Sequence, residues 1–414
     1  MILITSIINI LIIRYFLNSY FKYPFSWLFF SGLCYSLMLL GGSTLLWLFD
    51  SVTPYKMPLN NLNYAYADAL TGLLLASASA IALRKIFSPH TKKASIPSIF
   101  PAKSLNLPLL FLAIISLSCM AIFIGVNGLS LGENEYSYRY DVSRGWGAAI
   151  LFFPAFMPLA FYKIISSKNS RKFLIFSISS VIVGTLTFIT LSGYRQILIG
   201  TILISVSVGI HKGHIKRWHL IPGLLLSLAL LVILSFVRYA NDTGNFTNLW
   251  ISAFYYLQGD VFPMDAPLKI QEYYSRYSAA PPGSSVVLNH IGKIIPRFIW
   301  TDKPQILLDA AGFYTQEISQ YLRQITLSPT ILGEGYLVGG RLAFYLIAIS
   351  TGLTLSLIDI TSSQNKIFFI FSGAFQYAGF FLIREGFSEL LLRLFFLFIF
   401  LTLYKAIYKL IYFR

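Results

Sequence analysis

The chain has 414 residues, of which 56% are hydrophobic and only 12% are charged, and its formal net charge is +16. Soluble domains contain about 25% charged residues, so this composition excludes a single water-soluble core. The positive charge would suggest nucleic acid in a soluble protein. Here the basic residues gather in short loops between apolar runs, as in the cytoplasmic loops of membrane proteins, and no nucleic-acid partner is expected.

Apolar runs long enough to cross a bilayer occur along most of the chain, since a spanning helix needs roughly 17–25 residues. The run with Arg14 and the short run before Lys212 fit this criterion least well. Residues 1–13 lack the features of a cleavable signal. The predicted fold is an all-α polytopic membrane protein of GT-C-like architecture, with about 11 transmembrane helices at 2–20, 27–49, 66–87, 106–127, 147–166, 171–192, 196–210, 218–237, 341–358, 366–384 and 389–411.

Charge orients these helices. Basic loops at 84–103, 163–172 and 212–217 are expected in the cytoplasm, which puts the N-terminus outside and the C-terminus inside. All acidic residues except Asp359 then fall on the outer side. The expected organisation is helices one to eight in 1–237, a large periplasmic loop in 238–340, and the last three helices in 341–414.

The long outer loop is the predicted working surface, because connections longer than about 15 residues are usually functional or disordered. Its many aromatic and aliphatic residues argue against disorder. Segments 247–258 and 305–322 are predicted to form amphipathic helices along the membrane surface. Cys34 and Cys119 both lie in predicted helices, so neither a disulfide framework nor a metal cluster is expected.

Arginine is preferred over lysine in the outer segments, whereas the inner loops prefer lysine. Arg offers a planar fork that binds phosphate through two hydrogen bonds. Any single interfacial Arg can instead extend its side chain from a helix end to water. As a set, the outer arginines predict an anionic ligand; they are Arg139, Arg144, Arg195, Arg238, Arg276, Arg297, Arg323, Arg341 and Arg384.

Arg195 stands at a predicted helix start, where unpaired N–H groups and the helix dipole favour phosphate. Arg238 and Arg384 end predicted helices, and Glu385 is either the ion-pair partner of Arg384 or a free acid. Ser328-Pro329-Thr330 predicts a helix start, with Ser328 as N-cap and Pro329 at the first position.

Glu334 lies among glycines that would admit either a ligand or a neighbouring helix, and it is a plausible base. His290 is the single histidine of the outer segments. A structural role is the commoner one for such a residue, and a catalytic role stays open.

Several short motifs in a fixed order resemble the Wzy-type polysaccharide polymerases, and most of all the polymerase of enterobacterial common antigen. The likeness covers roughly residues 130–400, while the first hundred residues agree only in hydropathy. The motifs are Ser192-Gly193-Tyr194-Arg195, Val237-Arg238-Tyr239, Gly259-Asp260-Val261-Phe262, Ile299-Trp300 with Pro304, Ser328-Pro329-Thr330 with Gly333 and Gly339-Gly340, and Arg384-Glu385-Gly386 with Arg393.

The resemblance implies a multi-pass protein of the bacterial inner membrane with its active site facing the periplasm. Such enzymes join oligosaccharide repeat units carried on undecaprenyl pyrophosphate, with a chain-length regulator as partner, and use neither metal, cofactor nor nucleotide sugar. It also implies that Arg195, Arg238 and Arg384 contact the pyrophosphate, and we add Arg341 to this set. The chain departs from the common-antigen pattern near His290 and Arg297, which favours an O-antigen polymerase.

In the expected reaction a sugar hydroxyl of the acceptor attacks the anomeric carbon of the growing chain, and undecaprenyl pyrophosphate leaves. The arginines stabilise the leaving group, and an acid or histidine takes the hydroxyl proton. Candidates for this base are Glu334 and Asp260, followed by Glu385 and then His290. The alternatives are a common-antigen polymerase, an O-antigen ligase that depends on His290, and a lipid-linked oligosaccharide flippase or transporter.

Overall fold

A computed structural model of the chain shows an all-α protein, and no strand occurs among the residues that it describes. These residues are 2–48, 59–87, 103–128, 146, 149–150, 152–190, 195–219, 263–277, 280–292, 295, 300–302, 308–319 and 327–412. The helices α1 to α10 are α1 (Ile2–Lys22), α2 (Trp27–Tyr35), α3 (Gly42–Leu48), α4 (Leu59–Phe87), α5 (Lys103–Asn127), α8 (Met157–Ser166), α9 (Ser170–Thr190) and α10 (Arg195–His211). The later helices are α13 (Asp265–Tyr277), α14 (Ser285–Gly292), α15 (Ala310–Phe313), α16 (Thr330–Gln364), α17 (Lys366–Ala374), α18 (Ala378–Glu385) and α19 (Phe387–Tyr412).

Short segments of other helix types join some of these elements. Residues Ser36–Gly41 (η1) and Tyr314–Ile318 (η5) are π-helical, and Phe153–Phe156 (η2) and Arg217–His219 (η3) are 3₁₀-helical. The π-helix η1 lies inside an otherwise continuous apolar helix. Asn9 donates from its amide to Leu40 O at 2.9 Å and accepts from Tyr66 Oη at 2.7 Å. This buried side chain thereby satisfies a carbonyl within η1, which matters in a membrane because no water can do so.

Seven helices of the described chain are long and apolar enough to cross a membrane. An eighth span arises if α17 and α18, which meet at a 49° bend, are counted as one broken span. Two of the predicted runs fall on shorter apolar helices, Phe153–Ser166 and Gln196–His211. Ten of the eleven predicted runs therefore coincide with helices, and most of 218–237 lies outside the described residues. The polytopic all-α fold is confirmed, whereas the count of eleven spans stays a prediction.

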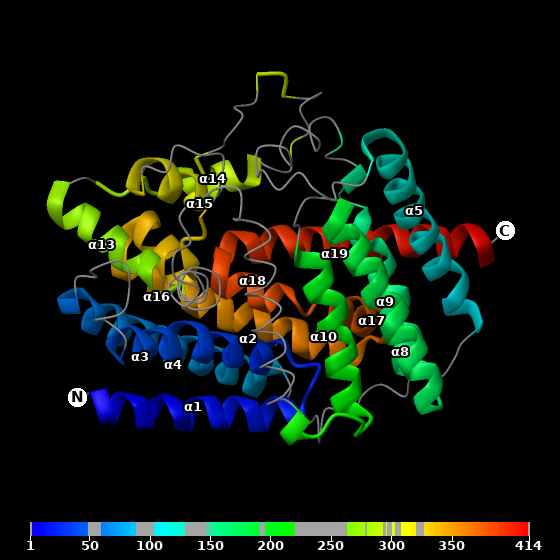
Figure 1. Cartoon of the computed structure of the whole chain (residues 1–414), viewed down its shortest axis with the longest axis horizontal. Coiled ribbons are helices and arrows are strands. Elements are labelled where there is room, and N and C mark those ends of the chain that lie inside the picture. The colour runs from blue at the N-terminus through cyan, green and yellow to red at the C-terminus, as the bar shows by residue number, and fades with distance from the viewer. Residues whose placement is uncertain are drawn as a thin grey trace, which may run out of the picture. The chain divides into compact units, whose positions relative to one another are not determined.

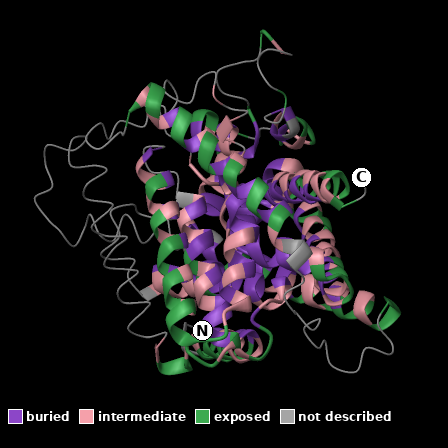
Figure 2. Cartoon of the chain, turned by 90° about the vertical axis from the view of Figure 1, so that its right-hand side faces the viewer, coloured by how far each residue is buried: buried purple, intermediate pink, exposed green. Residues whose placement is uncertain are grey.

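The spanning helices expose large apolar side chains that a soluble protein would bury. Leu74 is 62% exposed, Ile122 57% and Ile182 54%. In Figure 2 such long helices carry exposed residues along one side and buried or intermediate residues along the other. Lipid is the solvent that makes an apolar outer face stable, so these faces fit the membrane assignment.

The described chain forms two compact units. The first comprises Met1–Phe87, Ile221–Leu357 and Ala378–Leu391. Within it α1 packs against α2 and α3, α4 packs against α2, α3 and α13, and α18 packs against α2. In Figure 1 the helices α1 to α4 are blue, α13 is yellow-green and α18 is orange-red. The Ser79 hydroxyl also donates to Ile349 O at 3.1 Å, which ties α4 to α16.

The second unit comprises Ser88–Leu220, Ile358–Tyr377 and Leu392–Arg414. Here α8 packs against α5, α9, α10 and α17, and α9 lies along α10. Aromatic rings fill this core: Phe161 meets Phe369 edge-on at 5.6 Å between centroids, and Phe371 meets Tyr404 at 5.7 Å. Each unit combines three separate stretches of the sequence, so neither corresponds to one of the three predicted parts. The division into 1–237, 238–340 and 341–414 stays a prediction.

Helix α16 begins at Thr330, inside the segment predicted as loop, and breaks near the predicted boundary at 340/341. Gly340 has φ +72° and ψ −153°, a conformation that an L side chain rarely adopts. The expectation for the helix start was wrong in detail. Thr330, not Ser328, provides the capping hydroxyl, which accepts from Gly333 N at 3.2 Å, and Pro329 precedes the helix.

The two predicted surface helices of the long loop have different outcomes. Residues 247–258 lie outside the described residues. Within 305–322, α15 and η5 form a shorter helical segment, Ala310 to Ile318. Its N-cap is Asp309, whose carboxylate accepts from Gly312 N at 2.9 Å.

Candidate active site

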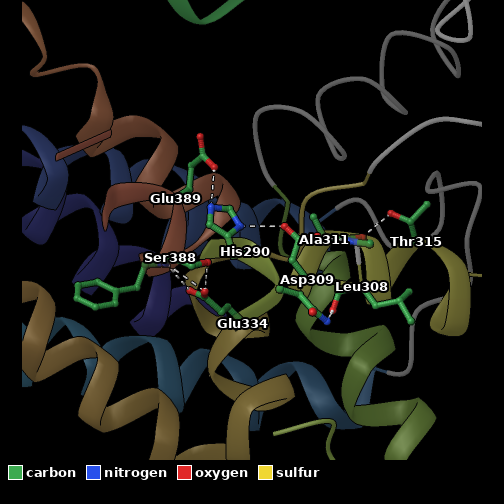
Figure 3. A network of polar contacts seen from close by, with 11 residues as sticks. His290, Leu308, Asp309, Ala311, Thr315, Glu334, Ser388 and Glu389 are labelled. Atoms are coloured by element: carbon green, nitrogen blue, oxygen red, sulfur yellow. Dashed lines mark hydrogen bonds and ion pairs between the residues drawn. The ribbon is translucent and has the colours of Figure 1, made fainter. Parts of the chain in front are cut away.

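A buried histidine lies between two buried carboxylates in the first unit. His290 Nδ1 is 2.9 Å from Asp309 Oδ2, and His290 Nε2 is 3.2 Å from Glu389 Oε2. Figure 3 shows the ring held between the two acids, one on each side. The side chains of His290, Asp309 and Glu389 are 7%, 2% and 11% exposed. Burying ionisable groups this deeply costs free energy. A cluster in which a histidine lies between two carboxylates therefore indicates a functional site.

Three elements far apart in sequence bring this group together. His290 is on α14, Asp309 caps α15, and Glu389 is in the first turn of α19. Asn289 Nδ2 donates to Leu308 O at 2.9 Å, which holds α14 beside the residue before Asp309. The helix dipole favours a negative charge at the position of Glu389.

The geometry limits the protonation states of the cluster. His290 Nδ1 and Asp309 Oδ2 share a hydrogen bond, whereas the contact from Nε2 to Glu389 is an ion pair when the ring is protonated. With a protonated ring, the group is an imidazolium between two carboxylates and carries a charge of −1. A buried imidazole in such a group is suited to proton transfer.

Glu334 lies next to this group and is bound to the start of α19. Its carboxylate accepts from the backbone N–H groups of Phe387 and Ser388 and from the Ser388 hydroxyl. His290 is near enough to interact with it electrostatically, and Figure 3 shows both in one network. Gly386, with φ +116°, precedes this contact, and a Cβ there would collide with the Glu334 carboxylate. Glu334 is thus a buried capping group of α19 as well as a predicted base.

The glycines around Glu334 serve packing in this structure. A Cβ on Gly335 would collide with the backbone of Phe344, and one on Gly333 would lie 2.8 Å from Ile270 Cδ1. The sequence left two roles open for these glycines, namely access for a ligand and close approach of another helix. The contacts at Gly333 and Gly335 show close approach of other segments of the same chain.

Another buried acid, Asp68 on α4, joins both sides of the break in α16. It accepts from Tyr336 Oη at 2.6 Å, from Arg341 Nε at 2.9 Å and from Tyr345 Oη at 2.8 Å. Tyr336 precedes Gly339-Gly340, and the other two residues follow it. Asp68 therefore fixes the direction in which α16 continues after its break.

Arg341 is the predicted phosphate ligand whose surroundings are best defined. Its Nε is bound to Asp68, its guanidinium lies 5.3 Å from the ring centroid of Tyr64, and its side chain is 52% exposed. A guanidinium fixed at Nε and stacked on an aromatic ring loses little further freedom when its outer edge binds an anion.

The other predicted site residues are placed in part. Arg384 and Glu385 are half-buried at the end of α18. Arg195 is the first described residue of α10, and the helix start expected there stays a prediction. Arg238 and Asp260 lie outside the described residues. The structure thus brings Glu334 and His290 into one network, while the roles assigned to the remaining residues stay predictions.

Arg393, from the last of the resembling motifs, is buried in the second unit. Its Nη1 donates to Gln196 Oε1 at 2.9 Å, and its guanidinium lies 5.4 Å from the ring centroid of Tyr377. Gln196 follows Arg195 on α10. This link joins the start of α10 to α19 within that unit.

Three acidic residues of these networks were missed from the sequence, namely Asp68, Asp309 and Glu389. Asp68 and Glu389 had been counted inside predicted apolar spans. An acid in such a run is a candidate functional residue by itself, because its burial in a membrane must be compensated. Asp309 carried a weaker signal, that of an N-cap before a short helix.

Among the aromatic residues of the long outer loop, Tyr273 and Tyr274 lie on α13. Their ring centroids are 5.7 Å apart, and Tyr273 also contacts the exposed Tyr277 at 5.1 Å. Burial, and then the neighbouring Tyr273, raises the pKa of Tyr274 to about 12, so this phenol keeps its proton near neutral pH. Tyr314 is buried, and Tyr255 and Tyr256 lie outside the described residues.

The fold and the buried acid–histidine network define a multi-pass α-helical membrane protein with an ionisable site. A sequence model of one family, described as WzyE protein, O-antigen assembly polymerase, matches residues 1–414. The chain therefore belongs to the WzyE family of polysaccharide polymerases, which are enzymes of the glycosyltransferase type. The match includes the first hundred residues, where the sequence had shown likeness only in hydropathy. No solved structure matches the chain, so the GT-C-like architecture stays a prediction.

Within the described residues, no group of three or more His, Cys, Asp or Glu side chains is arranged to hold a metal ion.

Proposed function

We propose that the protein polymerises surface-polysaccharide repeat units at the periplasmic face of the bacterial inner membrane. The growing glycan is transferred from undecaprenyl pyrophosphate to the non-reducing end of an undecaprenyl-pyrophosphate-linked repeat unit. The hydroxyl oxygen of the acceptor attacks the anomeric carbon, the bond from that carbon to the pyrophosphate oxygen breaks, and undecaprenyl pyrophosphate leaves with the electron pair.

The observation that carries this proposal is the buried His290–Asp309–Glu389 group beside Glu334, in a chain that belongs throughout to a polymerase family. Glycosyl transfer to a hydroxyl needs a proton acceptor, and buried acids paired with histidine are suited to that role. It also needs positive charge at the leaving pyrophosphate, which the predicted set Arg195, Arg238, Arg341 and Arg384 would supply.

The full-length family match gives weight to a second candidate substrate, the repeat unit of enterobacterial common antigen. The preference for O-antigen rested on a departure from the common-antigen pattern near His290 and Arg297, and the match now includes the first hundred residues. We keep O-antigen repeats as the first proposal because the family description names O-antigen assembly. Purified protein given each lipid-linked repeat separately distinguishes the two.

The decisive experiment incubates the protein, in lipid nanodiscs, with one undecaprenyl-pyrophosphate-linked repeat unit and no other acceptor. A ladder of chains that differ by one repeat supports a polymerase. No product until lipid A core is added would identify a ligase, and movement of intact repeat across a vesicle membrane without new linkages would identify a flippase. Adding a chain-length regulator, the proposed partner, should narrow the ladder to a preferred length.

A further inference from the structure

We propose that Glu389 is the general base of chain extension and that His290 and Asp309 position and charge-compensate it. This inference rests on the proposed polymerase function and deepens it. Glu389 was not among the bases expected from the sequence, because it lies inside an apolar run.

The first argument is the gradient of exposure along the group. Asp309 is 2% exposed, His290 is 7% exposed and Glu389 is 11% exposed. A substrate hydroxyl that approaches from the more exposed end meets Glu389 first. Figure 3 shows one Glu389 oxygen directed at the His290 ring and the other directed away from it.

The second argument is the different situation of Glu334. Both of its oxygens accept hydrogen bonds from Ser388, and Oε2 also accepts from Phe387 N. It is 1% exposed. A substrate hydroxyl would have to displace these donors before it could reach a Glu334 oxygen. Glu334 therefore holds the first turn of α19 in place, and that turn carries Glu389.

The third argument is the role that the ring can play. Asp309 is itself fixed, since its other oxygen accepts from Gly312 N at 2.9 Å. It therefore fixes the Nδ1 side of His290, so that Nε2 stays directed at Glu389. With His290 protonated, a proton taken by Glu389 changes the group from a charge of −1 to neutral, so the remaining imidazolium and the Asp309 carboxylate compensate one another.

The proposed step balances without any further reactant. The O–H bond of the acceptor hydroxyl breaks and its proton moves to Glu389. The oxygen forms the new glycosidic bond at the anomeric carbon, and the leaving undecaprenyl pyrophosphate keeps the electron pair. Glu389 then gives the proton to water before the next cycle.

The test compares Glu389→Gln and Glu389→Ala with wild-type protein in the single-repeat assay, with and without formate. General-base catalysis contributes about 10²–10⁴-fold, so the Gln variant should lose at least about 100-fold in kcat while the KM for the lipid-linked donor stays near wild type. Formate, a small carboxylate, should restore part of the activity of the Ala variant. Glu272→Gln is the matched control, since Glu272 is an exposed acid of the same unit paired with Arg276.

His290→Gln and Asp309→Asn test the positioning roles. Each should lower kcat by about 10-fold or more with the KM little changed, because only the base loses its orientation. Formate should not restore either variant, since Glu389 still occupies the base position.

The outcomes separate this inference from the proposed function. If wild-type protein makes no ladder, the polymerase proposal fails. If it makes a ladder and Glu389→Gln extends chains at the same rate, Glu389 is not the base. A folded Ala variant that formate does not restore, or restoration of Glu334→Ala instead, also overturns the inference. If the Gln and Ala variants do not fold, Glu389→Asp decides. A reduced kcat with an unchanged melting temperature supports the inference, and an unchanged kcat overturns it.

Discussion

Ser388 donates both its backbone N–H and its hydroxyl to the carboxylate of Glu334, 54 residues earlier in the chain. The contact makes an acid from α16 the N-terminal cap of α19. Caps of this kind are normally supplied by the residue just before the helix. Here that position is Gly386, which has no side chain to offer, and its positive φ lets the chain turn tightly around the Glu334 carboxylate.

Glu334→Gln should therefore destabilise the protein. The amide keeps one acceptor oxygen but loses the charge that pairs with the helix end, and its NH₂ group faces backbone donors. We expect a loss of about 1–3 kcal/mol, measured as a lower melting temperature in detergent. Folded variant protein should still extend chains. A variant with a normal melting temperature and no extension would contradict this and restore Glu334 as the base.

Asp68→Asn should loosen the link between α4 and α16. One carboxylate serves two tyrosine hydroxyls and Arg341, and an amide cannot accept from all three. Breaking a fully buried pair costs about 3–5 kcal/mol, and Arg341 is half exposed, so we expect about 2–4 kcal/mol. Tyr345→Phe, which removes one hydroxyl, should cost only about 1 kcal/mol. Equal melting temperatures for Asp68→Asn and Tyr345→Phe would show that Asp68 does not organise the cluster.

Arg341→Lys should weaken binding of the lipid-linked donor. Lysine keeps the charge but cannot place one nitrogen on Asp68 while it presents a second edge to phosphate. A rise of about tenfold in KM corresponds to the loss of about 1.4 kcal/mol of binding free energy. Parallel Lys variants of Arg195, Arg238 and Arg384 test the rest of the predicted set. Arg84→Lys is the control, because Arg84 lies in a basic loop that is predicted on the cytoplasmic side. Wild-type KM in all four variants would remove the pyrophosphate role.

Hydropathy located the helices well, because the apolar length that a bilayer requires is a property of local sequence. It did not locate their interruptions. The π-helix in Ser36–Gly41 and the 49° bend between α17 and α18 leave average hydropathy unchanged, so a window over the sequence does not detect them. The break at Gly339-Gly340 did carry a signal, and it falls near the predicted end of the loop.

The site was predicted only in part for a similar reason. Glu334 and His290 were both named, but their partners depend on tertiary packing. Tyr345 meets Asp68 across 277 positions of the chain, and Ser388 meets Glu334 across 54. Glu389 was counted as part of a spanning run, because one charged residue changes the mean hydropathy of such a run very little. Treating every acid inside an apolar run as a candidate would have found both Asp68 and Glu389.

Gly340→Ala should be strongly destabilising through the backbone alone. Nothing lies within 4 Å of a Cβ built at Gly340, so space is not the obstacle. Its φ of +72° with ψ −153° is unfavourable for an L residue, and we expect a loss of about 1–3 kcal/mol. Gly125→Ala is the matched control, because Gly125 is equally unobstructed but lies within helix α5, where alanine should be neutral or stabilising. Equal effects of the two substitutions would show that α16 does not need its break.

Membrane orientation follows from charge and is open to direct measurement. The basic loops predict a periplasmic position for Ser284, which is exposed at the turn before α14, and a cytoplasmic position for Ser95. In a background with Cys34 and Cys119 replaced by serine, an impermeant thiol reagent should label Ser284→Cys in intact spheroplasts and leave Ser95→Cys unlabelled. After detergent lysis Ser95→Cys should become labelled, which shows that the thiol is reactive. The reverse pattern in intact spheroplasts would place the His290 network on the cytoplasmic side, where the proposed periplasmic polymerisation could not take place.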